Sequence, residues 1–456
     1  MTTHQKPKFT LLLLLTAAAS LLPGFTTGNF SGDVVVQMYM QIHNITYTQA
    51  QAKLVPLETM LNSAVLIGSI SISLVFSFIS KSIGFKKTAI IGSSGSIITV
   101  ILQCIPVSEY LMLIGRILQG FFMTMFMIAT LIILGEYTDP HKRGFMTYFF
   151  QVMFTVGILV ATIVFYIIKV VNVNIWYISF ITTLPWPIIG LIILFKIPEF
   201  EKKEKEIKYY QIFNKKYIKV LVPCLLLGTL QQSTGINAVI GYASETFNVI
   251  FGDYKLAAVY GSLVINSINF VSPLFGLVLI EKYGRKALLF TGTGLCIVGQ
   301  LLLLLTYTLP KENTFLLITG AIIFIFGFEI GPGPIYYVFS AELFPDIAKS
   351  TLVSIFFLFN YIPNIFVIVL FPILTAYARY IPFLSYIIAM SIFSGMLIFV
   401  LPDTTGKTNK EIEELMIGKS SKVENIEPLI SYLTFVVLAM LLSIVIVMSQ
   451  MPDVFV

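Results

Sequence analysis

Residues Glu201-Lys202-Lys203-Glu204-Lys205-Glu206 lie in the longest polar interruption between the first twelve apolar runs of this chain, the stretch from Pro198 to Lys219. Six apolar runs precede it and six follow, each long enough to cross a bilayer as a helix. The runs cover residues 9–30, 57–79, 88–107, 110–134, 145–168, 175–197, 218–242, 256–280, 287–309, 314–340, 351–377 and 381–401. Mixed charge of this kind is typical of a solvated linker, helical where Glu and Lys are spaced to pair. The sequence therefore predicts two six-helix halves joined by a polar linker.

Composition sets the class of protein. The 456 residues are 57% hydrophobic and only 11% charged, and the mean hydropathy is +0.90. No soluble domain has these values. The chain is predicted to be an all-α polytopic membrane protein.

The distribution of positive charge predicts the orientation. With the amino terminus in the cytosol, all but five of the 29 Lys and Arg residues fall on the inner side. The exceptions are Lys53, Lys169, Lys255, Lys311 and Arg379. The net charge of +6 then reflects topology and not a nucleic-acid partner, because the basic residues are scattered over short loops.

The sequence contains no sign of catalytic or metal chemistry. Cys104, Cys224 and Cys296 all lie within apolar runs, and the three histidines are isolated. No nucleotide-binding loop, catalytic triad or metal-ligand spacing is present. We expect neither an enzyme nor a cofactor, and no obligate protein partner is implied.

The two halves repeat one another. Gly84-Phe85-Lys86 after the second run recurs as Gly284-Arg285-Lys286 after the eighth, 200 residues later. Glu136 precedes Arg143 by seven residues, and Glu342 precedes Lys349 by the same interval. Repeats of equal topology imply a pseudo-twofold axis along the membrane normal, with the substrate site between the halves near the midplane. The predicted divisions are residues 1–197, a linker 198–217, residues 218–401, a cytosolic segment 402–428, and a tail 429–456.

Polar amides interrupt the seventh run. The segment Gln231-Gln232-Ser233-Thr234-Gly235-Ile236-Asn237 places three carboxamides in a stretch that is otherwise apolar. Carboxamides are uncharged donors and acceptors, which suits a neutral ligand rich in hydroxyl groups. The alternative is that these amides hydrogen-bond across to neighbouring helices and bind no ligand.

Proline and glycine interrupt the tenth run. In Gly331-Pro332-Gly333-Pro334 each proline removes a backbone donor and clashes with the preceding turn, so the helix should bend there. Irregular backbone at membrane depth is tolerated where it lines a cavity, so this segment is a candidate inner hinge. The alternative is a static kink.

These two motifs, about a hundred residues apart and followed by Glu342-Leu343-Phe344-Pro345, resemble the sugar-porter branch of the major facilitator superfamily. The pattern is closest to that of the facilitative glucose transporters, and it extends over nearly all of residues 9 to 415. The resemblance implies the major facilitator fold of two six-helix bundles. It also implies a hexose substrate.

Matching residue by residue, the resemblance assigns substrate contacts to Gln151, Gln231, Gln232, Asn237, Asn269, Glu329, Tyr337, Asn360 and Asn364. Tyr337 and Tyr361 replace tryptophans of the family, and their added hydroxyl groups are expected to change affinity or sugar preference. At the outer end of the seventh run the family's tyrosine pair is here Gly241-Tyr242.

The resemblance assigns gating roles to Arg116, Glu136, Arg143, Tyr242, Glu281, Arg285, Gly331, Pro332, Gly333, Pro334, Glu342 and Lys349. The charged members are expected to form ion pairs between the halves at their cytosolic ends. The alternative is that they are ordinary interfacial anchors, since exposed pairs contribute at most about 1 kcal/mol each. The first half departs from the family pattern at Lys81 and Ser82, which weakens its part of the network.

The first run predicts the mode of transport. In Gly24-Phe25-Thr26-Thr27-Gly28, Thr26 stands where proton-coupled sugar symporters carry aspartate. Threonine does not exchange a proton at physiological pH, which favours uniport. Glu329 keeps proton-coupled symport as an alternative, and a non-transporting sugar sensor is another. A channel is disfavoured because the polar residues converge at one depth.

Two further features concern topology in the plasma membrane. Asn44-Ile45-Thr46 is an acceptor sequence for N-glycosylation in the stretch assigned to the outside. Residues 429–448 contain no charge and are long enough to form a thirteenth span. The alternative for this segment is a helix lying in the membrane interface.

Overall fold

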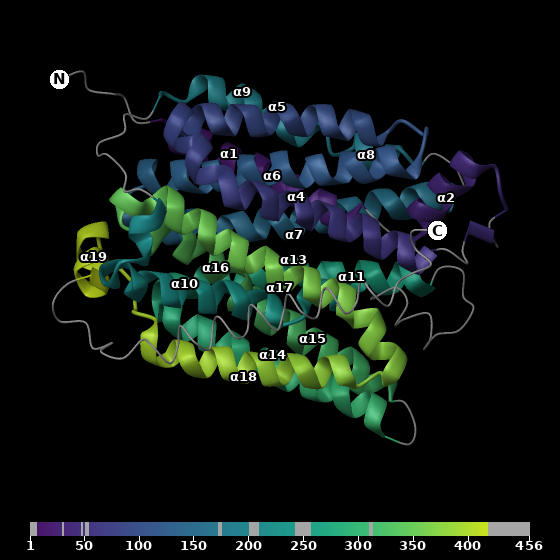
Figure 1. The fold of residues 1–456 in the computed structure, drawn as a ribbon. Helices are drawn as coiled ribbons and strands as arrows, with labels where there is room; N and C mark the ends of the chain where they lie inside the picture. Colours follow the sequence, from purple (N-terminus) through teal and green to yellow (C-terminus); the bar gives the residue numbers. More distant parts are fainter. Residues whose placement is uncertain are drawn as a thin grey trace.

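The computed structural model describes residues 7–29, 32–46, 49–50, 54–171, 176–199, 209–241, 257–309 and 313–417. Within these ranges the ordered elements are helices, and no strand is present. Figure 1 shows most of the long helices running side by side along one direction. The predicted all-α fold is confirmed, whereas Tyr242 and residues 429–448 lie outside the described residues.

The first half is built from helices that match the first six apolar runs. They are α1 (Phe9–Gly28), α4 (Leu54–Ile83), α5 (Phe85–Gln103), α6 (Glu109–Tyr137), α7 (Pro140–Val171), α8 (Ile178–Ile181) and α9 (Pro185–Lys196). The last run divides into α8 and α9 with proline at the start of α9, where its missing N–H and fixed φ are tolerated.

The second half contains the remaining runs. They form α10 (Lys215–Ser233), α11 (Ile236–Gly241), α13 (Ala257–Tyr283), α14 (Arg285–Thr308), α15 (Thr314–Ile330), α16 (Pro332–Glu342), α17 (Lys349–Tyr377) and α18 (Ile381–Val400). Short helices η1 (Tyr209–Phe213), η2 (Asp346–Ala348) and α19 (Asn409–Ile417) lie between and after them.

Eleven helices of the described chain are long and apolar enough to cross a membrane. The seventh predicted run is not among them, because its amides lower its hydropathy and it is divided into α10 and α11. All twelve predicted core runs nevertheless correspond to helix, so the twelve-helix core agrees with the sequence.

The repeated Gly84 and Gly284 have the same local structure. Each precedes a long helix, α5 or α14, and each has a left-handed backbone, with φ of 85° and 83°. A side chain at such a φ is strained, which accounts for glycine at both positions. The sequence repeat is therefore also a structural repeat.

The two halves meet along a few helix pairs. α4 packs against α17, and α7 packs against α13 and α16. Buried apolar side chains of both halves form one continuous core. We call the end where α1 begins and α9 ends the linker end, since the linker leaves from it.

The opposite end carries a helix that the sequence did not suggest, α2 (Gly32–His43), and we call it the α2 end (Figure 1). Val34, Val35 and Met38 of α2 join a separate apolar cluster that includes Trp176. Trp176 Nε1 donates to Gln41 Oε1 at 2.6 Å. The stretch predicted to be a long outer loop is thus a packed cap on the first half.

Candidate functional site

The seventh span is broken at the amide motif. α10 ends at Ser233, α11 begins at Ile236, and Gly235 between them has φ +81°. The turn is held locally, since Gly235 N donates to the Gln232 carbonyl at 3.0 Å and Thr234 Oγ1 donates to the Gln231 carbonyl at 2.8 Å. The single continuous helix expected over residues 218–242 is therefore wrong, because glycine permits a left-handed turn within it.

This break brings together two amides that a regular helix would separate. Gln232 and Asn237 are five residues apart, which on a continuous helix places them about 140° apart around the axis. Across the break, Asn237 Nδ2 donates to Gln232 Oε1 at 2.8 Å. The same Nδ2 donates to Asn364 Oδ1 of α17 at 2.9 Å.

Further bonds extend the group to five carboxamides. Gln232 Nε2 donates to Gln231 Oε1 at 3.0 Å and to Asn360 Oδ1 at 3.2 Å, and Asn360 Nδ2 donates to Gln231 Oε1. We call Gln231, Gln232, Asn237, Asn360 and Asn364 the amide cluster. It lies between α10, α11 and α17 and offers neutral donors and acceptors that can exchange partners with hydroxyl groups.

A carboxyl group from the tenth span bridges the two halves. Glu329, 1% exposed in the last turn of α15, accepts from Gln151 Nε2 of α7 at 3.0 and 2.9 Å. Tyr148 OH, also on α7, donates to the Glu329 backbone carbonyl at 3.0 Å. The predicted interruption of the tenth span follows directly, since α15 ends at Ile330 and α16 begins at Pro332.

Aromatic residues adjoin these polar groups. The ring of Tyr337 lies 4.8 Å from that of Phe150 in the other half. Tyr361 OH lies 3.2 Å from Thr124 Oγ1 of α6, which in turn donates to Ser69 Oγ at 2.9 Å. The added hydroxyl of Tyr361 is therefore engaged by the opposite half.

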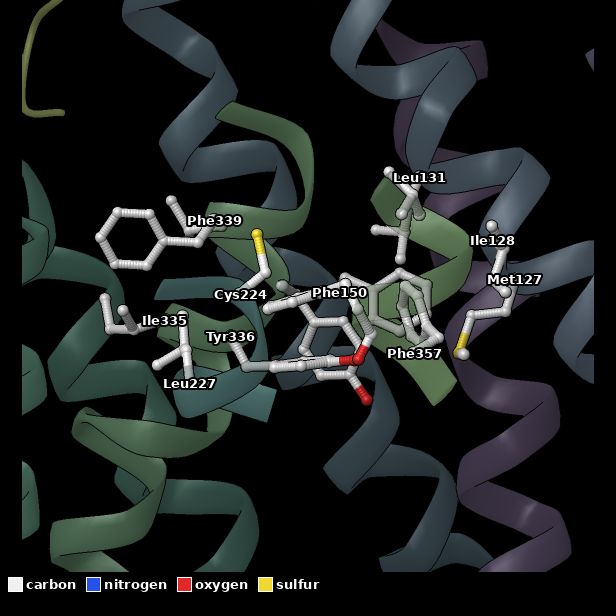
Figure 2. Close-up of a cluster of buried hydrophobic side chains, with 14 of the residues drawn as sticks. Met127, Ile128, Leu131, Phe150, Cys224, Leu227, Ile335, Tyr336, Phe339 and Phe357 are labelled. Atoms are coloured by element: carbon white, nitrogen blue, oxygen red, sulfur yellow. The ribbon is translucent and has the colours of Figure 1, made fainter. Parts of the chain in front are cut away.

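Toward the linker end, buried apolar side chains of both halves pack together in a group that we call the apolar layer (Figure 2). It contains Met127, Ile128, Leu131, Phe150, Cys224, Leu227, Ile335, Tyr336, Phe339 and Phe357. These side chains come from α6, α7, α10, α16 and α17, and each is at most 2% exposed. Leu227 and Phe357 lie about one turn before Gln231 and Asn360, so the layer adjoins the amide cluster.

Polar contacts join the halves beyond this layer. Lys349 Nζ of α17 lies 2.6 Å from Glu136 Oε1 of α6. Thr351 Oγ1 accepts from Lys81 Nζ at 2.7 Å and lies 2.8 Å from Ser77 Oγ. Lys81, which departs from the family pattern, thus takes part in the contact between halves through a neutral partner.

The remaining predicted gate charges do not all cross the interface. Arg285 pairs with Glu342 at 3.0 Å and with Glu281 at 3.4 Å, all within the second half. Thr404 Oγ1 also donates to Glu342 Oε2 at 2.7 Å. From the first half, Gly144, the neighbour of Arg143 in sequence, approaches these charges. A Cβ added to Gly144 would lie 2.8 Å from Glu281 Oε1.

The placement of Arg116 with the linker-end charges is corrected. Arg116 and Glu136 share α6 but lie about 30 Å apart along it. Arg116 is nearer the α2 end, where it donates to the Leu61 carbonyl and to Asn62 Oδ1, both at 3.3 Å. The resemblance had grouped Arg116 with the cytosolic gate charges, whereas this guanidinium is buried and donates to acceptors of α4.

Asn269 stands apart from the amide cluster. It is fully buried on α13, and within the described part of the chain neither its Nδ2 nor its Oδ1 has a hydrogen-bond partner. One turn away, Asn266 Nδ2 donates to Thr162 Oγ1 of α7 at 2.9 Å. Sequence reasoning did not select Asn266, although an asparagine within an apolar run, three residues before Asn269, was the available signal.

The fold and the geometry define a class of protein: a two-bundle helical membrane protein with buried polar groups near the contact of its halves. A family model described as "Sugar (and other) transporter" matches residues 12–200 and 199–416. The chain belongs to this family of sugar and other transporters. It is therefore a member of a transporter family and not an enzyme.

Individual relatives agree with this assignment. The chain is 32% identical over 229 residues to the facilitated trehalose transporter Tret1 of Bombyx mori, covering 48% of this chain and 44% of that protein. It is 30% identical over 222 residues to facilitated glucose transporter member 3 of Mus musculus, again 48% and 44%. The alignments thus span about half the length of these relatives.

Solved structures share the fold. The proton:xylose symporter XylE bound to 6-bromo-6-deoxy-D-glucose has a TM-score of 0.77 at 19% identity, covering 89% of this chain and 98% of that one. The inward open conformation of XylE from E. coli has a TM-score of 0.66, covering 90% and 99%.

Proposed function

We propose that this protein is a uniporter that moves a hexose such as glucose across the membrane by alternating access. The observation that carries the proposal is the amide cluster, in which five uncharged and largely buried carboxamides of the second half bond to one another. Hydroxyl groups of a sugar can replace these mutual bonds without any change in charge. Nearby aromatic faces such as Tyr337 suit the apolar face of a pyranose.

The closed linker end supports alternating access. The apolar layer and the contacts of Lys349 and Thr351 join the halves on that side. Release toward the linker end requires these contacts to separate. Sugar is therefore taken from the α2 end in the conformation described, and the halves rock about the site.

The first span supports transport without proton coupling. Thr26 Oγ1 donates to the Leu22 carbonyl of its own helix at 2.9 Å. The buried Arg116 contacts the neutral acceptors Leu61 and Asn62. Thr26 itself does not exchange a proton at physiological pH, so this position of the first span offers no group for proton coupling.

Proton-coupled symport remains the second candidate because of Glu329. This carboxyl is buried and its partner is the neutral amide of Gln151, so its protonation would change the bond that joins the halves. The structural relatives include a proton:xylose symporter. A non-transporting sensor is a third possibility, which a flux measurement separates from both.

Uptake into proteoliposomes tests the proposal. Labelled glucose, xylose and trehalose are each offered with and without an imposed pH difference. We expect glucose to reach equal concentrations on both sides whatever the pH difference. Accumulation above equilibrium that follows the proton gradient and is lost in Glu329→Gln would establish symport. Saturable sugar binding without flux would establish a sensor.

The same experiment defines the substrate. The relatives named for trehalose and glucose show similar identity to this chain, so both sugars belong in the panel. We propose the plasma membrane as the location, with the linker end in the cytosol. Trehalose uptake without glucose uptake would replace the hexose assignment by a disaccharide one.

A further inference from the structure

Gln300 contacts the break in the seventh span from outside the amide cluster. It lies on α14, is fully buried, and donates from Nε2 to the Thr234 backbone carbonyl at 3.0 Å. Its Oε1 has no hydrogen-bond partner among the residues that the structure describes. No role in sugar binding or gating follows from the sequence motifs for this residue.

The Thr234 carbonyl needs a donor because the helix does not continue past it. In a regular helix this carbonyl would accept from the backbone N–H four residues later. That donor would be Ala238 N, but among the described residues α11 starts with the bond from Val239 N to the Gly235 carbonyl at 3.0 Å, and Gln300 donates to the Thr234 carbonyl. A buried carbonyl without a partner is costly, so a side-chain amide from α14 stabilises the broken form.

A second contact also packs against the break. An added Cβ at Gly235 would lie 2.8 Å from Cζ of Tyr386 on α18. The turn is therefore held between the Gln300 amide and an aromatic ring. Its position along the chain cannot shift by one residue without losing both contacts.

We propose that Gln300 is a positioning residue for sugar binding, acting through the break at Thr234 and Gly235. Its amide fixes the Thr234 carbonyl, the fixed turn sets the direction of α11, and α11 places Asn237 against Gln232 and Asn364. This inference rests on the proposed sugar-binding function of the amide cluster. Gln300 thereby affects sugar binding without touching the sugar itself.

The test is a double-mutant cycle between Gln300 and Asn237. Gln300→Met keeps a similar length and removes the donor. We expect Gln300→Met alone to weaken sugar binding by about 10-fold, the loss of roughly one well-placed hydrogen bond. In an Asn237→Ala background the same change should have less than about a twofold effect, because Gln300 acts through Asn237.

The matched control is Thr293→Val on the same helix. Thr293 is equally buried, but its hydroxyl donates to the Leu289 carbonyl of α14 itself at 2.8 Å. Sugar affinity should remain unchanged in this variant. Equal losses from Gln300→Met in both backgrounds would show a general structural effect and overturn the proposal.

Two further outcomes are decisive. Gln300→Asn keeps the amide but is too short to reach, and it should repeat the affinity loss of Gln300→Met. If both variants fail to reach the membrane while Thr293→Val does, Gln300 serves folding and the proposal is wrong.

A structure of Gln300→Met without sugar tests the inference separately from the proposed function. The Gln232–Asn237 bond should be lost there, and its retention contradicts the proposal even if the wild type binds no sugar.

Discussion

At the scale of single residues, the site uses uncharged groups that already have partners. Each bond within the amide cluster must be exchanged when a hydroxyl group binds, so the net gain per contact is small. Asn269 differs because its amide has no partner to give up among the described residues. The balance between exchanged and new bonds sets the affinity.

Truncation of the amide cluster should weaken sugar binding. Gln232→Ala, Asn237→Ala and Asn364→Ala each remove one partner of a sugar hydroxyl, at a cost of about 1–3 kcal/mol. This corresponds to roughly 10- to 100-fold in Kd, measured by equilibrium binding to purified protein. Ser267→Ala is the control, since the exposed Ser267 bonds only to its own helix. Wild-type affinity in all three variants would contradict the site.

The Tyr361 hydroxyl should affect turnover more than affinity. Because Thr124 of the other half lies 3.2 Å from it, Tyr361→Phe removes a bond of about 1 kcal/mol between the halves. We expect sugar Kd within about threefold of wild type and a change in transport rate. Thr124→Val removes this bond and also the one to Ser69, and Tyr361→Phe added in that background should change the transport rate no further. A large change in sugar preference would instead show that the hydroxyl contacts the substrate.

At the scale of elements, broken helices depend on glycine contacts with their neighbours. Gly331, at the break between α15 and α16, lies against α14, where an added Cβ on Gly292 would be 2.6 Å from Gly331 Cα. This spacing allows α14 to support the irregular backbone of the tenth span. Both breaks that shape the site are thus supported by the same helix, through Gly292 and through Gln300.

Alanine at Gly292 should displace the tenth span. The added Cβ meets backbone that cannot move aside as a side chain can, and overpacking of this kind costs about 1–3 kcal/mol. Gly292→Ala is expected to lower the thermal stability of the purified protein and to reduce transport. Gly294→Ala is the matched control, because nothing lies within 4 Å of its added Cβ. Equal behaviour of the two variants would refute the role of the close contact.

At the scale of the whole molecule, contacts at the linker end determine which side of the site is closed. The Glu136–Lys349 pair joins the halves, whereas the Arg285 pairs stabilise the second half internally. Lys349 is almost completely buried and Glu136 is 18% exposed, so the pair is less screened than a surface ion pair.

Removal of one charge should favour opening at the linker end. In Lys349→Met, Glu136 loses its partner, and the ratio of open to closed molecules should rise by roughly 10-fold or more, equivalent to about 1.4 kcal/mol. Faster maleimide labelling of Leu131→Cys in the apolar layer reports the change. The charge exchange Glu136→Lys with Lys349→Glu should restore slow labelling. Unchanged labelling in Lys349→Met would exclude a gating role for the pair.

The orientation of the molecule is open to a direct test. Asn44 is exposed after α2 at the α2 end, with a left-handed backbone. We expect a mobility shift on glycosidase treatment that Asn44→Gln abolishes, in a host that glycosylates. Labelling of residue 44 from the cytosol would reverse the topology.

A carboxyl-terminal tag stained in intact cells would support a thirteenth span at 429–448.

The sequence by itself determined the class, the number of core spans, the repeat and the types of residue at the site. These follow from local properties: apolar length, charge distribution, and the conformational limits of glycine and proline. The sequence therefore predicts the repeat at Gly84 and Gly284 and the interruption at Gly331-Pro332. The family resemblance supplied the individual site positions.

Only the tertiary structure decided which groups meet. The Gln232–Asn237 bond depends on a break that residues of α14 and α18 support, and no periodicity along one helix predicts it. The buried position of Arg116, the link from Tyr361 to Thr124, and the packing of α2 likewise depend on distant segments. Hydrogen bonds and close packing act over a few ångströms between residues far apart in sequence, so they are fixed only when the helices assemble.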